Sequence, residues 1–233
     1  MNAKGNGGRP METEIISCRT LETELTQAMK NTGTEYPVHY LESGLHNTPA
    51  KLFQRMSEVL DPIPPGRVLV AMGYCGNSIS GLKAGDHELI VPRVDDCISL
   101  LLHTDDKLHP NLKEDGHLYL YENDPKDFSA LTLMHNTNSF TQELDLKNMS
   151  KEFLFEMWFH NYRYMDVIDT GLNDCYSEEY AAAAQDQADQ IKATLDYVPG
   201  SIRLLEKLVS GRWDQQFITA EPGRTILHGD FFG

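Results

Sequence analysis

The chain has 233 residues, of which 20 are lysine or arginine and 35 are aspartate or glutamate, so its formal net charge is −15. This acidic balance argues against a protein that wraps nucleic acid, which needs a basic surface, and against electrostatic docking on anionic membranes. No apolar run approaches the roughly 18 residues of a membrane span.

Residues 1–13 are predicted to form a disordered lead, because their first part is polar and rich in glycine. Residues 14–233 are predicted to form one α/β domain. In its first part, short apolar runs alternate with helical patterns. The predicted strands there are 15–17, 38–41, 67–72 and 89–91, and the predicted helices are 21–29, 49–60 and 98–102.

The second part of the chain has a less regular pattern. Residues 117–121 alternate like a strand, and residues 105–150 are predicted to contain a lid or an insertion, because their central part has mixed signals. The remaining predicted elements are helices at 150–164, 178–195 and 201–209 and strands at 165–169 and 217–219.

The alternation of strands and helices indicates the fold class. Successive strands that are joined by helices pair in parallel through right-handed crossovers. We therefore expect an α/β fold with one mostly parallel sheet flanked by helices in Rossmann-like layers.

Four cysteines are too few for a disulfide scaffold in a chain of this length, and no signal peptide precedes them. We therefore expect a reduced, cytoplasmic protein. Cys18, Cys75 and Cys97 each follow a predicted strand, as does His46. Because the carboxyl ends of parallel strands share one edge of a sheet, these four side chains are expected to lie at the same rim.

Three thiols and an imidazole predict a metal site at this rim. The set Cys18, Cys75, Cys97 and His46 suits zinc, and three thiolates with an open fourth position also suit an iron–sulfur cluster. The spacing matches no local zinc signature, so the prediction depends on topology, and burial of the thiols as small apolar side chains is the competing interpretation. Cys175 is expected to stand apart.

The segment GYCGNSISG, which begins at Gly73, is a glycine-rich turn before a predicted helix. Gly73, Gly76 and Asn77 are the residues that would bring the backbone close to a cofactor. The turn lacks the lysine of a phosphate-binding loop, so a tight strand-to-helix turn is the alternative.

Charged residues beside the thiols are candidates for catalysis. Arg93 could favour the thiolate of Cys97, and Asp96 could support a ligand or cap the following helix. Glu22, one turn after Cys18, is either a rim carboxylate or a partner of the helix dipole. Asp169, at the end of a predicted strand, could bind a cofactor at the rim or bond its own turn.

Several ordered segments resemble the domain-of-unknown-function 1638 family of anaerobic archaea and bacteria. They span residues 15–226 and read ISCRTLETEL, YLESGLHNTP, GYCGNSISGL, PRVDDCISLLL, VIDTGL and PGSIRLLEKLVSGRWDQQFITAEPGRTI. By position, the resemblance implies roles for Cys18, His46, Cys75, Asp96 and Cys97. Many relatives carry a histidine at the place of Val94 and a Gly-Trp pair near residues 122–124, and this chain has neither.

The resemblance also implies a setting, because members of the family accompany corrinoid-dependent methyl-transfer systems. Three functional hypotheses follow. The first is a metal-binding protein of one-carbon or corrinoid metabolism, with zinc or an iron–sulfur cluster and a small-molecule ligand. The second is a non-enzymatic accessory protein that binds a corrinoid and serves a corrinoid protein or methyltransferase. The third is a metal-free enzyme with a thiolate nucleophile at Cys75 or Cys97.

Overall fold

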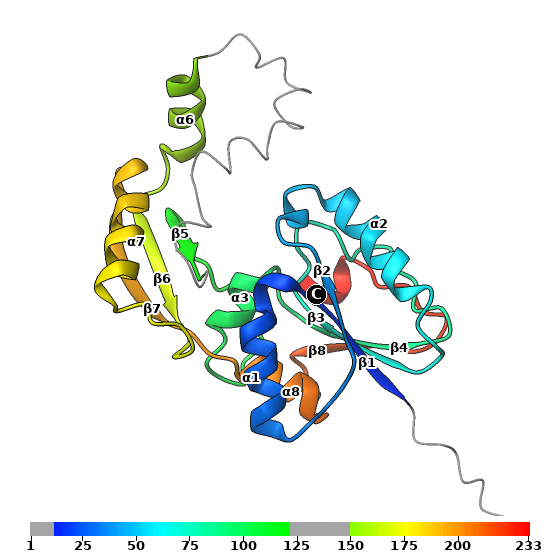
Figure 1. The fold of residues 1–233 in the computed structure, drawn as a ribbon. Coiled ribbons are helices and arrows are strands. Elements are labelled where there is room, and N and C mark those ends of the chain that lie inside the picture. Colours follow the sequence, from blue (N-terminus) through cyan, green and yellow to red (C-terminus); the bar gives the residue numbers. More distant parts are fainter. Residues whose placement is uncertain (1–11, 122–149) are drawn as a thin grey trace, which may run out of the picture.

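The computed structural model describes residues 12–121 and 150–233. Within these ranges the chain forms two β-sheets that are flanked by helices (Figure 1). The α/β class predicted from the sequence is therefore confirmed, although the strands are divided between two sheets instead of belonging to one. No helix in the described part is long and apolar enough to cross a membrane.

The first sheet contains the strands that were predicted in the first part of the chain. Among the described residues it has five strands in the order β2-β1-β3-β4-β8. The strands are β1 (Thr13–Cys18), β2 (Val38–Leu41), β3 (Arg67–Ala71), β4 (Glu88–Pro92) and β8 (Phe217–Ala220). β1 to β4 pair in parallel, and β8 runs antiparallel to β4. The last four residues of β3 and of β4 are buried, as expected for interior strands covered on both faces.

Helices cover both faces of the first sheet (Figure 1). On one side α1 (Glu22–Thr32) packs against α8 (Arg203–Ser210), which also contacts α3 (Cys97–Leu102). On the other side lies α2 (Pro49–Leu60), which begins at a proline and buries Leu52, Met56 and Leu60 at the four-residue spacing of an amphipathic helix. The remaining helices of this part are η1 (Arg19–Leu21), η2 (Leu45–Asn47) and α9 (Gly229–Phe232).

The second sheet is inserted in the chain between α3 and α8. It contains β5 (His117–Leu120), β6 (Tyr164–Asp169) and β7 (Thr194–Pro199), all parallel and in that order. α6 (Lys151–Phe159) and α7 (Glu178–Gln190) accompany it. Met165 and Val167 pack with Ala184 and Ala188 in a core separate from that of the first sheet. The insertion therefore extends well past residue 150, and its residues 122–149 lie outside the described part.

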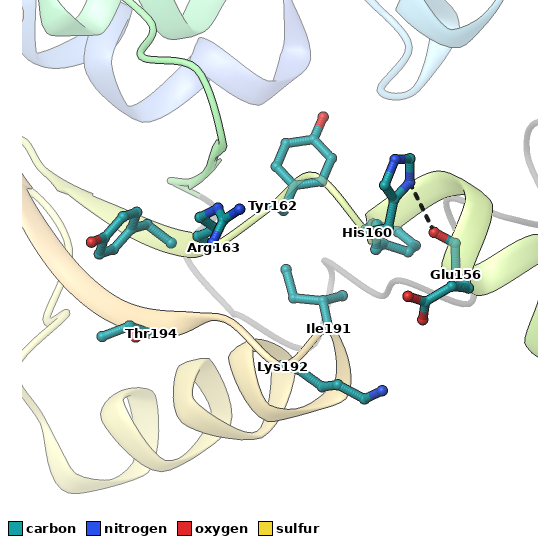
Figure 2. A pocket seen from close by; sticks show the side chains of 9 residues that line it. Glu156, His160, Tyr162, Arg163, Ile191, Lys192 and Thr194 are labelled. Atoms are coloured by element: carbon teal, nitrogen blue, oxygen red, sulfur yellow. Dashed lines mark hydrogen bonds between the residues drawn. The ribbon is translucent and has the colours of Figure 1, made fainter.

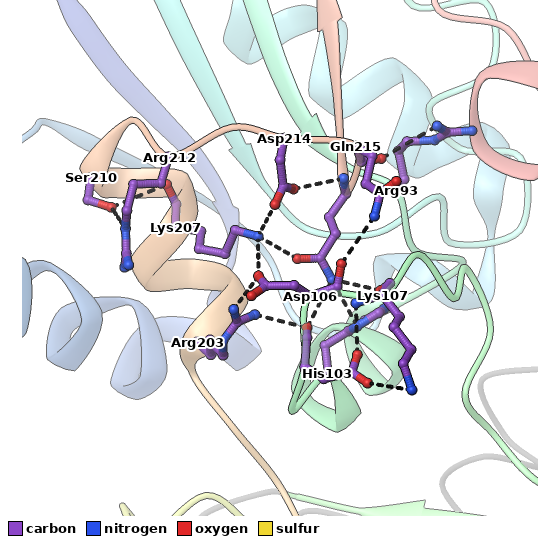
Figure 3. Close-up of polar contacts among 12 residues, drawn as sticks. Arg93, His103, Asp106, Lys107, Arg203, Lys207, Ser210, Arg212, Asp214 and Gln215 are labelled. Carbon is purple, nitrogen blue, oxygen red and sulfur yellow. Dashed lines mark hydrogen bonds and ion pairs between the residues drawn. The ribbon is translucent and has the colours of Figure 1, made fainter.

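A buried lysine fastens the loop after α3 to the segment that returns to the first sheet (Figure 3). Lys207 of α8 is 4% exposed. Its Nζ donates to Asp106 at 2.8 Å, to Asp214 at 2.6 Å and to Oε1 of Gln216 at 2.6 Å. Arg203 also pairs with Asp106. Bonds from Arg203 and Lys207 lower the pKa of Asp106 to about 2.

The boundaries of the second sheet differ from the sequence predictions. The helix predicted over 178–195 ends at Gln190, and Thr194–Pro199 is a strand that the prediction missed. Lys192, with φ of +56°, reverses the chain between them. The helix predicted to reach residue 164 ends at Phe159, because the following residues enter β6. Pairing with a neighbouring strand overrides the local helical pattern in both places. At the other end, residues 1–11 of the predicted lead lie outside the described residues, and Thr13 already belongs to β1.

Candidate functional site

The strand order determines which loops meet at the rim of the first sheet. β1 pairs with β2 on one side and with β3 on the other. The chain therefore changes direction across the sheet between β1 and β3, and ligands of open α/β sheets bind at such a switch point. Cys18 ends β1, and Cys75 follows β3 by four residues. The two thiols are thus delivered to the switch point from adjacent strands.

Cys97 joins this pair as the first residue of α3, after β4. Its thiol lies within hydrogen-bonding reach of the thiols of both Cys18 and Cys75. All three residues are 7–8% exposed and all three are free cysteines. The structure therefore brings together three of the four predicted ligands, and we call them the thiol cluster.

Two thiols of the cluster, those of Cys18 and Cys97, have raised pKa values. The bond to Cys97, burial and the neighbouring thiol charge raise the pKa of Cys18, although Thr20, whose Oγ1 lies 3.1 Å from the sulfur, opposes the shift. For Cys97, the bond from Cys18 lowers the pKa. The bond to Cys75, burial and the charges of Cys75 and Asp96 raise it by more, so the pKa of Cys97 is raised as well. Contact with a neighbouring thiol and burial thus disfavour the thiolate form of Cys18 and of Cys97.

Cys75 has an unusual backbone conformation. Its φ is +45°, and Gly76 and Asn77 follow with φ of +65° and +77°. A left-handed residue with a side chain costs roughly 1–2 kcal/mol, and such residues persist where the surrounding structure over-determines them, commonly at functional sites. Gly76 and Asn77 are residue types that tolerate this conformation, whereas cysteine is not.

Replacing Cys75 with glycine should therefore stabilise the fold relative to Cys75→Ala, by about 1 kcal/mol, because only glycine adopts this conformation without strain. Urea denaturation of the two variants checks this. The same pair at Cys18, which has ordinary extended geometry (φ of −68°), should show alanine as the more stable. Equal stability of the two Cys75 variants would contradict the inferred strain.

Gly73 brings the loops of Cys75 and Cys97 together. A Cβ atom at this position would lie 2.5 Å from Cα of Asp96 and 2.6 Å from its backbone N and C. The loops are joined beside it by bonds from Tyr74 N to the Val94 carbonyl at 2.9 Å and from Cys75 N to the Asp95 carbonyl at 2.6 Å. The predicted close backbone approach at Gly73 is thus made to another loop of the protein itself.

Asp96 serves mainly as the cap of α3. Its Oδ1 accepts from Ser99 N at 2.9 Å, and its other oxygen pairs with Lys113. Lys113 Nζ also lies 2.5 Å from Asp95. Burial opposes the charge of Lys113, but the carboxylates of Asp96 and Asp95 outweigh burial and raise its pKa. The cation beside this loop is therefore Lys113, which the sequence prediction missed because it follows Cys97 by sixteen residues.

Arg93 and Glu22, the other candidates for catalysis, have partners away from the thiols. Nη1 of Arg93 lies 3.5 Å from the Gln215 carbonyl, and the side chain lines a cavity of about 280 Å³ beside β8. Glu22 forms an exposed ion pair with Arg19 at 2.9 Å. These contacts support the structural interpretations of both residues.

His46 lies in η2, the turn before α2, with an exposed side chain. Partial desolvation lowers its pKa, and the charge of Asp96 works in the opposite direction. His46 is therefore electrostatically coupled to the Cys97 loop and favours the neutral form in which imidazole binds metals. The structure shows no bond between His46 and the thiol cluster.

Asp169 and Cys175 belong to the second sheet, so Asp169 does not lie on the rim of the first sheet, and its role toward a cofactor stays a prediction. Its carboxylate accepts from Gly171 N at 2.8 Å and from the Tyr176 hydroxyl at 2.9 Å, as in an ordinary turn. Cys175 is buried in the core of the second sheet, apart from the other thiols as predicted. The sequence could not assign β6 to a separate sheet because strand pairing is non-local.

The C-terminal segment covers the Cys75 loop, which the sequence did not indicate. The Tyr74 hydroxyl lies 2.8 Å from Nδ1 of His228 and also bonds to Asn77. The Tyr74 ring packs against Phe231 and Phe232 at centroid distances of 4.7 and 5.4 Å. Residues more than 150 positions away thus support the strained loop.

A cavity of about 450 Å³ lies elsewhere, at the amino ends of β6 and β7 (Figure 2). It is lined by Glu156, Phe159, His160, Tyr162, Arg163, Tyr164, Ile191, Lys192 and Thr194. None of these residues belongs to the thiol rim. Because α6 and α7 both end at this cavity, its cationic side chains complement the negative ends of the two helices.

As they stand, the side chains of the described ranges include no group of three or more histidine, cysteine, aspartate or glutamate residues arranged around a metal position. A family described as "Protein of unknown function (DUF1638)" matches residues 40–209. No curated protein and no solved structure matches the chain.

Proposed function

The chain belongs to the DUF1638 family, and we propose that it is a metal-binding protein whose thiol cluster holds one zinc ion. The observation that carries the proposal is the convergence of Cys18, Cys75 and Cys97 from three different strand ends on one buried point at the switch point. Three thiolates with a fourth position for another ligand are a donor set that zinc prefers.

The compactness of the cluster favours one ion over an iron–sulfur cluster. Bonds of about 2.3 Å to a single tetrahedral ion place the sulfurs about 3.8 Å apart. The thiol of Cys97, in hydrogen-bonding reach of those of Cys18 and Cys75, is close to that separation from each, whereas the ligands of a polynuclear cluster are spread around several irons. Binding would draw the three sulfurs around the ion and displace their protons, so affinity should rise with pH.

His46 is the residue of the described rim that is suited to the fourth position, since it is favoured in the neutral form and is coupled to the Cys97 loop. Zinc bound here would act as a Lewis acid on a thiol or water that takes the fourth position in place of His46. A metal-free thiolate enzyme has less support, because Cys18 and Cys97 both have raised pKa values.

We propose that the protein serves one-carbon or corrinoid methyl metabolism in the cytoplasm. The resemblance of its sequence to the family supports this setting. A methyl-accepting thiol at the fourth position of zinc is consistent with that setting. Cobalamin titration tests the alternative of a non-enzymatic corrinoid carrier: tight binding to the metal-free protein would favour the carrier.

Zinc titration of the anaerobically purified, metal-stripped protein tests the site. We expect one zinc per chain, and more than about 100-fold weaker binding in Cys18→Ser, Cys75→Ser and Cys97→Ser, because even residues that only support a ligand contribute 10–100-fold. Cys175→Ser is the matched control, since it is a buried free thiol outside the cluster.

Elemental analysis and a visible spectrum identify the metal of the protein as purified. Zinc without colour supports the proposal, and a brown protein with iron would replace zinc with an iron–sulfur cluster. The absence of any metal after anaerobic reconstitution, or equal losses in the Cys175→Ser control, would contradict the site.

A further inference from the structure

The second sheet has a polar face on the side opposite to its apolar core. Side chains alternate along a strand, and the register of β5, β6 and β7 places six polar or aromatic residues on this side, while Ile168 and Val198, farther along on the same side, pack in the core of the first sheet. We call this set the polar face: His117, Tyr119, Tyr164, Asp166, Thr194 and Asp196. Tyr164, Thr194 and Asp196 are exposed, but Asp166, on the middle strand, is only 2% exposed.

Asp166 uses one carboxylate oxygen to hold His117. Its Oδ2 lies 2.7 Å from Nδ1 of His117, and its Oδ1 is buried without a hydrogen-bond partner in the described ranges. Desolvation raises the pKa of Asp166, the bond to His117 lowers it, and the charges of Asp196 and Glu114 raise it further. Because this carboxylate is buried and has one described hydrogen-bond partner, its charge acts mainly on the imidazole of His117.

The imidazole is fixed in plane as well as in tautomer. The ring of Tyr164 stacks on His117 at 4.5 Å and 21°, and the ring of Tyr119 lies at 6.4 Å and 27°. With Nδ1–H donated to Asp166, the lone pair is on Nε2. Nε2 faces the carboxylate of Glu114 at 3.8 Å, and that side chain is 76% exposed and free to move away.

A cavity opens at the amino ends of two of these strands, and its lining also includes Phe159 and Ile191 of the apolar core. Tyr164 and Thr194, both on the polar face, line the 450 Å³ cavity of Figure 2. The ring that stacks on His117 is therefore also a wall of this cavity. His117 itself does not line the cavity, but its side chain is 19% exposed, so water reaches it from the solvent.

We propose that His117, oriented by Asp166, is a second functional site, independent of the thiol cluster, and acts as a general base toward the hydroxyl group of water or an alcohol. In the step, Nε2 accepts the hydroxyl proton while the oxygen forms a bond to an electrophilic carbon of the substrate. The electron pair released at the substrate leaves with its leaving group, and the imidazolium returns its proton to the leaving group or to solvent. Asp166 keeps its hydrogen bond throughout and stabilises the imidazolium.

Steady-state hydrolysis of p-nitrophenyl acetate tests this base, with water as the hydroxylic substrate. The rate is taken after any initial burst, so that stoichiometric acetylation of thiols is not counted. We expect His117→Gln and Asp166→Asn each to lower the rate above buffer by about tenfold. His109→Gln is the control, because this exposed histidine has no described ring hydrogen bond, and it should change the rate less than about twofold.

Rates for His117→Gln or Asp166→Asn that stay within about twofold of the wild type would overturn the proposal. If either variant fails to fold, ¹⁵N NMR of the wild-type imidazoles decides instead. The Nδ1–H tautomer at His117 is required, and the Nε2–H tautomer would overturn the assignment. Neither readout involves zinc, so failure here leaves the thiol site untouched.

Discussion

Gly73→Ala is expected to lower the free energy of unfolding by about 3 kcal/mol or more, because the new Cβ would overlap the backbone of Asp96. Neither partner can yield like a flexible side chain. Tyr74 and Cys75, which follow Gly73, are bonded to the carbonyls of Val94 and Asp95, and Asp96 caps α3 while pairing with Lys113. For a chain of this size, the loss corresponds to a melting temperature about 6–12 °C lower.

Thermal and urea unfolding of Gly73→Ala measure this effect. The matched control is Gly229→Ala in α9, where a Cβ meets nothing within 4 Å and φ is not left-handed. The control should be neutral or slightly stabilising. If the proposed zinc site is correct, Gly73→Ala should also weaken zinc binding, since it separates the loops that carry Cys75 and Cys97. An unchanged melting temperature would mean that the two loops do not approach as closely as the structure shows.

Lys207→Met is expected to cost about 3 kcal/mol, although methionine is apolar and similar in length. The substitution removes three charge-assisted bonds and leaves Oε1 of the buried Gln216 without its donor. Asp106 and Asp214 are 65% and 44% exposed at their side chains and regain water, which keeps the loss below that of a fully buried pair. The first sheet should loosen where the chain returns from the insertion.

Urea denaturation with Lys51→Met as the control measures the contribution of Lys207. Lys51 is exposed, and its substitution should change stability by less than about 0.5 kcal/mol. Hydrogen exchange should also rise in the loop after α3 and in β8, which Lys207 joins. Similar stabilities of the two variants would contradict a fastening role for the buried ammonium group.

Most of the first sheet could be predicted from the sequence. The runs that became β1 to β4 are short and apolar, and the helices between them show spacing such as Leu52, Met56 and Leu60. Both signals are local, because burial on a sheet or one helix face leaves its period in the sequence. Cysteines that directly follow these runs could be assigned to one rim because parallel strands end at the same edge.

The second sheet was predicted less well, for a physical reason. Leu195 and Tyr197 alternate in β7, but they follow an alanine-rich helix whose pattern runs into them. Only pairing with β6 decides that these residues are extended. The same non-local choice placed Asp169 in a different sheet from the one whose strands lead to Cys18, Cys75 and Cys97.

By itself, the sequence determined the α/β class, the family, the order of strands and helices in the first part of the chain, and the position of three cysteines at strand ends. These features follow from hydrophobic periodicity and chain order, which act over a few residues. Only the tertiary structure decided that β1 lies beside β3, that Lys113 accompanies Asp96, and that Asp166 holds His117. Those contacts join residues 17 to 54 positions apart, and packing and strand pairing, which no local pattern encodes, select them.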